Sequence, residues 1–148
     1  MAYNQLKLEN QMCFRFYTAS RLIVQGYHPH LSKLGITYPQ YLVLMVLWET
    51  DNMPVNEIAK RLVLETNTVT PLIQRMEQQK IVARHKGKND ARQTIVSLTA
   101  KGKNMEKEAA KIPGCLGNAL VSCGVDAEGL AGLAPELDTL IEHLKATK

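Results

Sequence analysis

The sequence has 148 residues, of which 45% are hydrophobic and 22% charged, with a formal net charge of +4. This composition excludes a disordered chain, and the length fits one domain with a sizeable core. No apolar run is long enough to span a membrane, and the first residues lack the pattern of a secretory signal. We therefore expect a cytoplasmic protein without a membrane partner. The mild positive charge is compatible with nucleic acid binding.

The first third of the chain predicts two helices. Apolar side chains at helical spacing indicate a helix over residues 6–27, which Gly26 and Pro29 are expected to loosen or end. Residues 30–35 are expected to form a short turn. A second, mostly apolar helix begins at Pro39, in the favourable first position, and runs to about Trp48.

Two short helices follow, over about 55–63 and 67–79. Each carries apolar residues on one face, which indicates that each covers a core. Proline is tolerated in the first turn of a helix, so Pro71 predicts that the second of these helices is capped near Asn67 or Thr68.

The apolar period then changes from that of a helix to that of a strand. One strand begins at Ile81 and a second covers 94–98, with a polar, turn-forming loop at 86–92 between them. This pattern predicts a β-hairpin. A helix capped by Thr99 follows, and residues 127–146 predict a final amphipathic helix.

Two short helices followed by a cationic hairpin have the order of a winged helix-turn-helix. The second helix would enter the major groove by its polar start, and the hairpin would reach the minor groove or the backbone. The candidate DNA-binding residues are Thr66, Asn67, Thr68, Thr70, Gln74, Arg75, Arg84, Lys86, Lys88, Asp90 and Arg92. Any one of them alone is more simply a helix cap or a solvated side chain, but the ordered combination favours DNA binding.

A candidate redox centre lies near the start of the chain. At about 100° per residue, Cys13, Tyr17 and Tyr27 fall in a narrow sector of one helix face. Phenol hydroxyls stabilise a thiolate, which is the form that reacts with peroxides. The alternatives are an inert buried cysteine or, in a different class, a thiol peroxidase, although no thioredoxin-like pattern is visible. Nothing in the cysteine spacing indicates zinc, and we expect no metal or cofactor.

Almost the whole chain, about residues 6–146, resembles the MarR-type winged-helix regulators. The wing segment Lys88-Asn89-Asp90-Ala91-Arg92 matches the Asp-x-Arg signature of that family. Three further blocks resemble the organic hydroperoxide resistance regulators: Leu8-Glu9-Asn10-Gln11-Met12-Cys13-Phe14, Ile36-Thr37-Tyr38-Pro39-Gln40-Tyr41-Leu42, and Thr68-Val69-Thr70-Pro71-Leu72-Ile73-Gln74-Arg75-Met76-Glu77. The chain departs from this subgroup at Glu65-Thr66-Asn67, where Asp-Ser-Gly is usual.

The resemblance implies a mainly α fold with a small β-hairpin wing, in which a winged helix-turn-helix is flanked by N- and C-terminal dimerisation helices. Residues 1–148 would form a single domain, with dimerisation helices at about 6–35 and 100–146 and the winged helix at about 54–98. The partners implied are a second copy of the chain and double-stranded, pseudo-palindromic operator DNA. Two-fold symmetry would place the recognition helices about 34 Å apart.

The resemblance also implies a function for the redox centre. Cys13 would sense an organic hydroperoxide, with Tyr27 and Tyr38 as its hydrogen-bonding partners and Tyr17 lining the pocket. Oxidation would release a repressor from its operator. A second thiol, Cys123 in preference to Cys115, would resolve the oxidised Cys13 as a disulfide, or a small thiol would do so. The alternative within the family is a regulator that responds to another oxidant or to a phenolic ligand.

Overall fold

The computed structural model describes residues 3–147 and divides the chain into two units, one ending at Tyr38 and one beginning at Pro39. The first unit contains two 3₁₀ turns, η1 (Asn4–Leu6) and η2 (Leu8–Asn10), and the long helix α1 (Met12–Leu34). Within the described residues, no helix is both long enough and apolar enough to cross a membrane.

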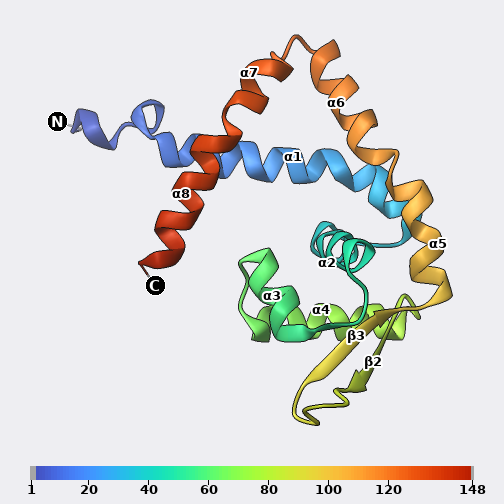
Figure 1. Cartoon of the computed structure of the whole chain (residues 1–148). Helices are drawn as coiled ribbons and strands as arrows, with labels where there is room; N and C mark the ends of the chain where they lie inside the picture. Colours follow the sequence, from blue (N-terminus) through green and yellow to red (C-terminus); the bar gives the residue numbers. More distant parts are fainter. Residues whose placement is uncertain (1–2, 148) are drawn as a thin grey trace. The chain divides into compact units, whose positions relative to one another are not determined.

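Helix α1 is longer than the sequence predicted and begins later. Pro29 lies inside the helix, so the expectation that it ends the helix and that residues 30–35 form a turn is wrong. Proline removes one N–H donor, but Gln25, whose carbonyl loses that donor, is exposed and can bind water. The helix ends instead at Gly35, whose φ of 70° is left-handed. Figure 1 shows α1 as one continuous helix.

The second unit contains the main hydrophobic core. Helices α2 (Tyr38–Glu49), α3 (Val55–Leu62) and α4 (Thr66–Gln78) supply most of its side chains. Most of α2 is buried, as expected from its almost continuous apolar sequence. In α4 the residues Val69, Ile73 and Met76 recur at helical spacing and are fully buried.

The start of α4 corrects a second proline-based prediction. The helix begins at Thr66, which makes Pro71 its sixth residue, so the cap expected at Asn67 or Thr68 is wrong. The carbonyl that loses its donor belongs to Asn67, which is exposed to solvent. As in α1, water can replace the missing hydrogen bond.

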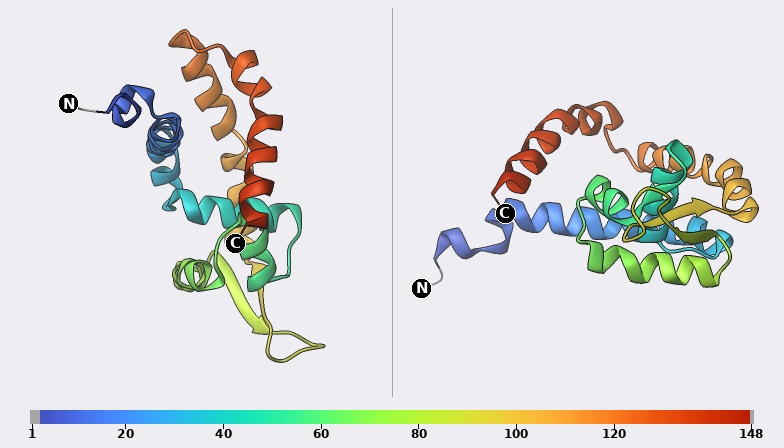
Figure 2. Two further views of the ribbon diagram at one scale, coloured as in Figure 1. Left: turned by 90° about the vertical axis from the view of Figure 1, so that its left-hand side faces the viewer. Right: turned by 60° about the horizontal axis from the view of Figure 1, so that its bottom comes forward.

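The predicted hairpin is confirmed, and it forms part of a three-stranded antiparallel sheet. The strands are β1 (Met53–Pro54), β2 (Val82–Lys86) and β3 (Thr94–Leu98), in the order β1-β3-β2. Arg84 pairs with Val96 across the hairpin. Figures 1 and 2 show the loop between β2 and β3 projecting as a wing. The predicted helical fold with a small β wing is thus confirmed, with β1 as an addition.

Four helices follow the wing: α5 (Ala100–Ala109), α6 (Ile112–Ser122), α7 (Ala127–Gly132) and α8 (Ala134–Ala146). The single helix expected over residues 127–146 is therefore wrong. Pro135 cannot donate a hydrogen bond to the carbonyl of Ala131, and the chain divides at Leu133. Among the described residues after Ile112, none is buried.

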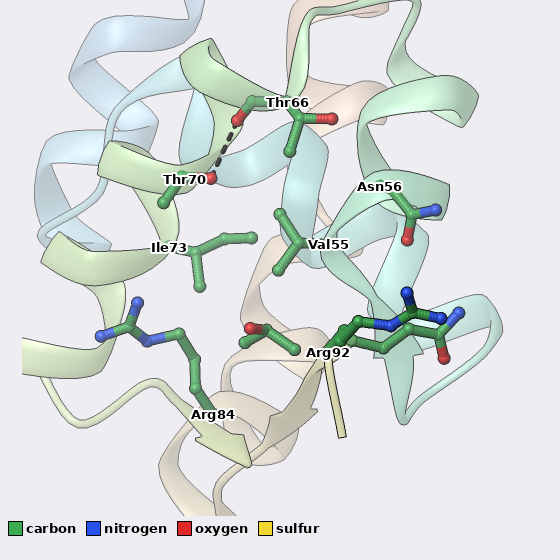
Figure 3. Close-up of a pocket in the computed structure, with 9 residues that line it drawn as sticks. Val55, Asn56, Thr66, Thr70, Ile73, Arg84 and Arg92 are labelled. Atoms are coloured by element: carbon green, nitrogen blue, oxygen red, sulfur yellow. Dashed lines mark hydrogen bonds between the residues drawn. The ribbon is translucent and has the colours of Figure 1, made fainter. Parts of the chain in front are cut away.

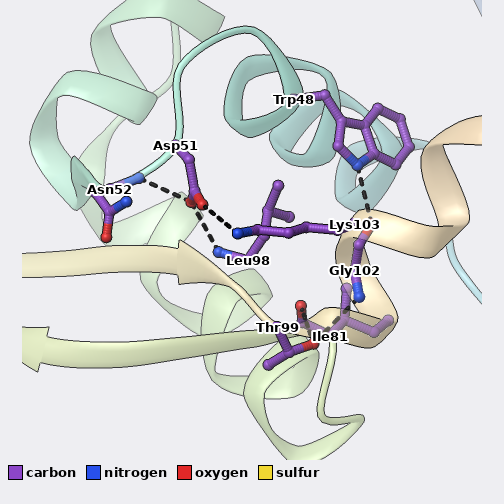
Figure 4. A network of polar contacts seen from close by, with 8 residues as sticks. All are labelled: Trp48, Asp51, Asn52, Ile81, Leu98, Thr99, Gly102 and Lys103. Carbon is purple, nitrogen blue, oxygen red and sulfur yellow. Dashed lines mark hydrogen bonds and ion pairs between the residues drawn. The ribbon is translucent and has the colours of Figure 1, made fainter.

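A polar network fixes the end of the wing to the neighbouring helices, as Figure 4 shows. The Asp51 carboxylate accepts hydrogen bonds from the backbone N–H groups of Asn52 and Leu98, both at 2.8 Å. The Lys103 ammonium of α5 lies 3.7 Å from the same carboxylate. One carboxylate therefore joins the turn after α2, strand β3 and helix α5.

The start of α5 is closely packed. The Thr99 hydroxyl accepts a hydrogen bond from the Gly102 N–H at 3.1 Å, which confirms the predicted cap. The Trp48 indole N–H donates to the Gly102 carbonyl at 3.0 Å. A Cβ atom on Gly102 would lie 2.3 Å from the Ile81 carbonyl oxygen, so only glycine fits there without a shift.

Candidate nucleic-acid interface and redox centre

The first turn of α4 presents unburied polar side chains at the positive end of a helix dipole. Thr66, Asn67 and Thr68 are exposed, and Glu65, at the N-cap position, forms no side-chain cap. Thr70 differs, because its hydroxyl donates to the Thr66 carbonyl at 2.9 Å. The remaining candidates on this helix, one turn further on, are also exposed: Gln74 and Arg75. The start of α4 can therefore offer hydrogen bonds to phosphates or base edges.

The wing presents exposed cations. Lys86, Lys88 and Arg92 are exposed, with 92% of the Arg92 side chain accessible. The Asp90 carboxylate accepts from the Arg92 backbone N–H at 3.0 Å and from its Nε at 3.2 Å. Asp90 thus shapes the turn and orients Arg92, which gives the Asp-x-Arg spacing a structural reason.

Helix α4, the start of α3 and the wing surround a hollow of about 290 Å³, which Figure 3 shows. Thr66, Thr70, Arg84 and Arg92, all singled out from the sequence, line it. Three further polar residues, which no sequence pattern indicated, also line it: Asn56, Gln93 and Thr94. Asn56 lies in the first turn of α3, and only the tertiary fold brings it beside the wing.

Arg84 is held differently from the other cations of the wing. Its Nε and Nη2 donate to Glu77 Oε2 at 3.0 and 2.8 Å, and only 30% of its side chain is accessible. These hydrogen bonds hold the pKa of the Glu77 carboxyl below its usual range.

The structure separates the predicted redox residues into two groups. Cys13 and Tyr17 lie one turn apart near the start of α1, and both are exposed. Tyr27 and Tyr38 form a pair, with ring centroids 5.0 Å apart and ring planes inclined by 56°. Burial, and secondarily the Tyr27 phenol, raises the pKa of Tyr38.

The two groups do not meet within one chain. Cys13 and Tyr27 belong to the same helix and are separated by 14 residues, which is about 21 Å along the axis. The expectation that they share a face holds for their direction around the helix, but the shared face does not bring them into contact.

The other two cysteines are also free and exposed. Cys115 lies in the first turn of α6, and Cys123 is the C-cap residue of that helix. Both belong to the unit that begins at Pro39.

Residues 25–109 match the family described as transcriptional regulator SarA/Rot. An organic hydroperoxide resistance transcriptional regulator of Bacillus subtilis is 40% identical over 142 residues, covering 96% of this chain and 95% of the relative. The chain belongs to the MarR family of winged-helix transcriptional regulators, of the organic hydroperoxide resistance type. It is a regulator and not an enzyme, so the thiol peroxidase alternative is wrong.

Solved structures support this membership. Reduced AbfR bound to DNA is 37% identical with a TM-score of 0.76, covering 95% of this chain and 96% of AbfR, a protein of Staphylococcus epidermidis. Overoxidised AbfR bound to DNA is 38% identical, with a TM-score of 0.72 and the same coverage. Disulfide-formed AbfR is 38% identical over 93% of this chain and 94% of AbfR, with a TM-score of 0.61.

Proposed function

We propose that this protein is a homodimeric repressor that senses organic hydroperoxides through Cys13 and leaves its operator when Cys13 is oxidised. The observation that carries the proposal is that the exposed Cys13 thiol shares a face of α1 with Tyr27, which lies further along that helix and pairs with Tyr38. The 40% identity to an organic hydroperoxide resistance regulator supports the choice of signal.

Operator binding is assigned to α4 and the wing. The exposed side chains at the start of α4 would read the major groove, together with Gln74 and Arg75. Arg92, with Lys86 and Lys88, would contact the backbone or the minor groove. The structure of reduced AbfR on DNA supports this assignment, because AbfR shares the fold over nearly the whole chain.

Dimerisation is assigned to helices within residues 6–35 and 100–146. Large apolar side chains are exposed on both stretches, including Phe16, Leu22 and Ile23 in the first. The second stretch exposes a stripe at helical spacing: Leu130, Leu133, Leu137, Leu140, Ile141 and Leu144. Apolar surface of this extent is typical of an interface, and a second copy would bury it.

A dimer would also complete the redox centre. If two α1 helices cross antiparallel about a two-fold axis near residue 20, each Cys13 comes beside Tyr27 of the partner subunit, because 13 and 27 are equally distant from 20. At about 100° per residue, Ser20 lies in the middle of the Cys13–Tyr27 face. Ala19 and Ser20 are small, which would allow the helices to approach closely.

In this arrangement the phenols would stabilise the Cys13 thiolate. The thiolate attacks one oxygen of the hydroperoxide, the O–O bond breaks, and the second oxygen leaves as an alcohol after taking a proton. The sulfur is oxidised to a sulfenic acid and the peroxide is reduced. A second thiol then attacks the sulfenic sulfur, which forms a disulfide and releases water.

The disulfide is proposed as the state that leaves DNA. Overoxidised AbfR was crystallised on DNA, which favours a disulfide over added oxygen atoms as the releasing change. Cys123, at the end of α6, is the preferred resolving thiol, with Cys115 or a small thiol as the alternatives.

Fluorescence anisotropy with the DNA upstream of the gene tests the proposal. Reduced protein should bind, cumene hydroperoxide should release the DNA, and Cys13→Ser should bind but ignore the peroxide. Cys115→Ser is the matched control for Cys123→Ser, which should slow or abolish release. If wild-type protein binds DNA but ignores hydroperoxide, the signal is a different oxidant or a phenolic ligand.

A further inference from the structure

An ion pair joins the wing to the recognition helix α4. Arg84 of β2 gives Glu77 three hydrogen bonds: two from the guanidinium to Oε2, and one from the backbone N–H to Oε1 at 3.2 Å. The two side chains are 30% and 37% accessible, so the pair is partly shielded from water. A partly shielded pair held by three hydrogen bonds is better defined than an exposed single contact.

The position of this pair follows from the sheet. Strand β2 is an edge strand, because the order is β1-β3-β2, and its outer N–H groups lack a neighbouring strand. Glu77 accepts one of those N–H groups. Arg84 pairs with the fully buried Val96, so its side chain leaves the sheet on the core side.

We propose that Glu77 and Arg84 are positioning residues that fix the angle of the wing to α4, and that Arg84 does not itself contact operator DNA. This inference rests on the proposed operator binding and deepens it. The exposed Arg92 at the wing tip makes the DNA contact, and the Glu77–Arg84 pair fixes the position of Arg92 relative to the DNA.

Glu77→Gln separates this proposal from simple electrostatics. Removing a negative charge near DNA would by itself strengthen binding. Loss of the positioning pair should instead weaken operator binding about tenfold, the size expected for a partly buried network. Glu57→Gln removes the same charge from α3 and is the matched control, which should leave binding unchanged or slightly tighter.

Arg84→Gln tests whether Arg84 touches phosphate. The affinity should fall about as much as in Glu77→Gln, while the dependence of log K on log salt keeps the wild-type slope. A direct phosphate contact would lower that slope by about 0.9.

The Arg92→Ala background distinguishes positioning from a general structural role. If Glu77 acts by positioning the wing tip, Glu77→Gln should lower operator affinity less than twofold in a protein that already carries Arg92→Ala. The proposal is overturned if Glu77→Gln binds the operator as well as wild type, or if Arg84→Gln has a reduced salt slope. It is also overturned if Glu77→Gln lowers operator affinity as much in the Arg92→Ala background as in wild type. Failure of wild-type protein to bind the operator would instead overturn the proposed function.

Discussion

The winged region and the terminal helices use apolar residues in opposite ways. Between Pro39 and Ile112, the large aliphatic side chains of α2, α3 and α4 are enclosed by the chain itself. Among the described residues after Ile112, comparable side chains such as Leu137 and Leu144 remain exposed. One chain is thus enough to complete the winged fold, whereas the helices after Ile112 carry apolar surface that the chain itself leaves exposed.

This difference separates two kinds of sequence information. The winged region encodes its own packing, including a close contact at Gly102 and a shared carboxylate at Asp51. Under the proposed dimer, the terminal helices encode complementarity to another copy of the chain.

The largest effect is expected from charges on the exposed stripe of α8. The double variant Leu137→Glu/Leu144→Glu should be monomeric, because two carboxylates would be buried in the interface. Operator affinity should fall about 100-fold or more when the two half-sites are no longer bound together. Sedimentation and anisotropy measure both quantities. Thr139→Glu, on the opposite face of α8, is the control; if the double variant stays dimeric, α8 is not in the interface.

Equivalent glycine substitutions should have opposite effects in the two regions. Gly102→Ala should lower the free energy of unfolding by about 2 kcal/mol, since the new Cβ would overlap the Ile81 carbonyl. Gly117→Ala, in α6 with no atom within 4 Å of the added Cβ, should raise it by about 0.5–1 kcal/mol. Urea unfolding compares the two. A destabilising Gly117→Ala would show that the partner subunit packs against that face.

Arg92→Ala should affect DNA binding without affecting folding. The affinity should fall about tenfold and the salt slope by about 1, because one exposed cation is lost from the contact. The free energy of unfolding should not change, since the side chain is almost fully accessible. A variant that unfolds more easily would assign Arg92 to the wing structure rather than to the operator.

The smallest effect concerns the tyrosine pair. Because the folded pKa of Tyr38 is raised, its contribution to stability is present below the unfolded pKa of about 10 and is lost as the pH rises through the folded value. Ultraviolet titration should show a late-ionising component that shrinks in Tyr38→Phe and is unchanged in Tyr17→Phe. Loss of the late component in Tyr17→Phe would contradict this assignment.

Patterns within a few residues of one another were predictable from the sequence. The helix pair, the hairpin and the Thr99 cap all follow from local spacing and turn chemistry. The errors at Pro29, Pro71 and Pro135 involve the same residue type. The residue whose carbonyl loses its donor is exposed in all three cases, yet α1 and α4 continue through their prolines and the chain divides before Pro135, so local sequence did not decide the outcome.

The site was predictable as a set of residue types but not as a set of contacts. Arg84 and Arg92 are both cations of the wing, yet Arg84 donates hydrogen bonds to Glu77 whereas the Arg92 side chain is almost fully exposed. Strand β1 is only two residues long and includes a proline, so it carries no alternating pattern. Strand β1 pairs with β3, which lies far along the chain, whereas Glu77 and Arg84 are close in sequence but belong to a helix and a strand whose packing brings them together.

The separation of Cys13 from Tyr27 along α1 has a genetic consequence under the proposed pairing. A chain lacking Cys13 and a chain lacking Tyr27 would each be insensitive when paired with itself. Mixed in one cell, they would form some pairs in which one complete centre is restored. Two defective alleles would then complement each other, because the sensing centre is assembled from both chains of the dimer.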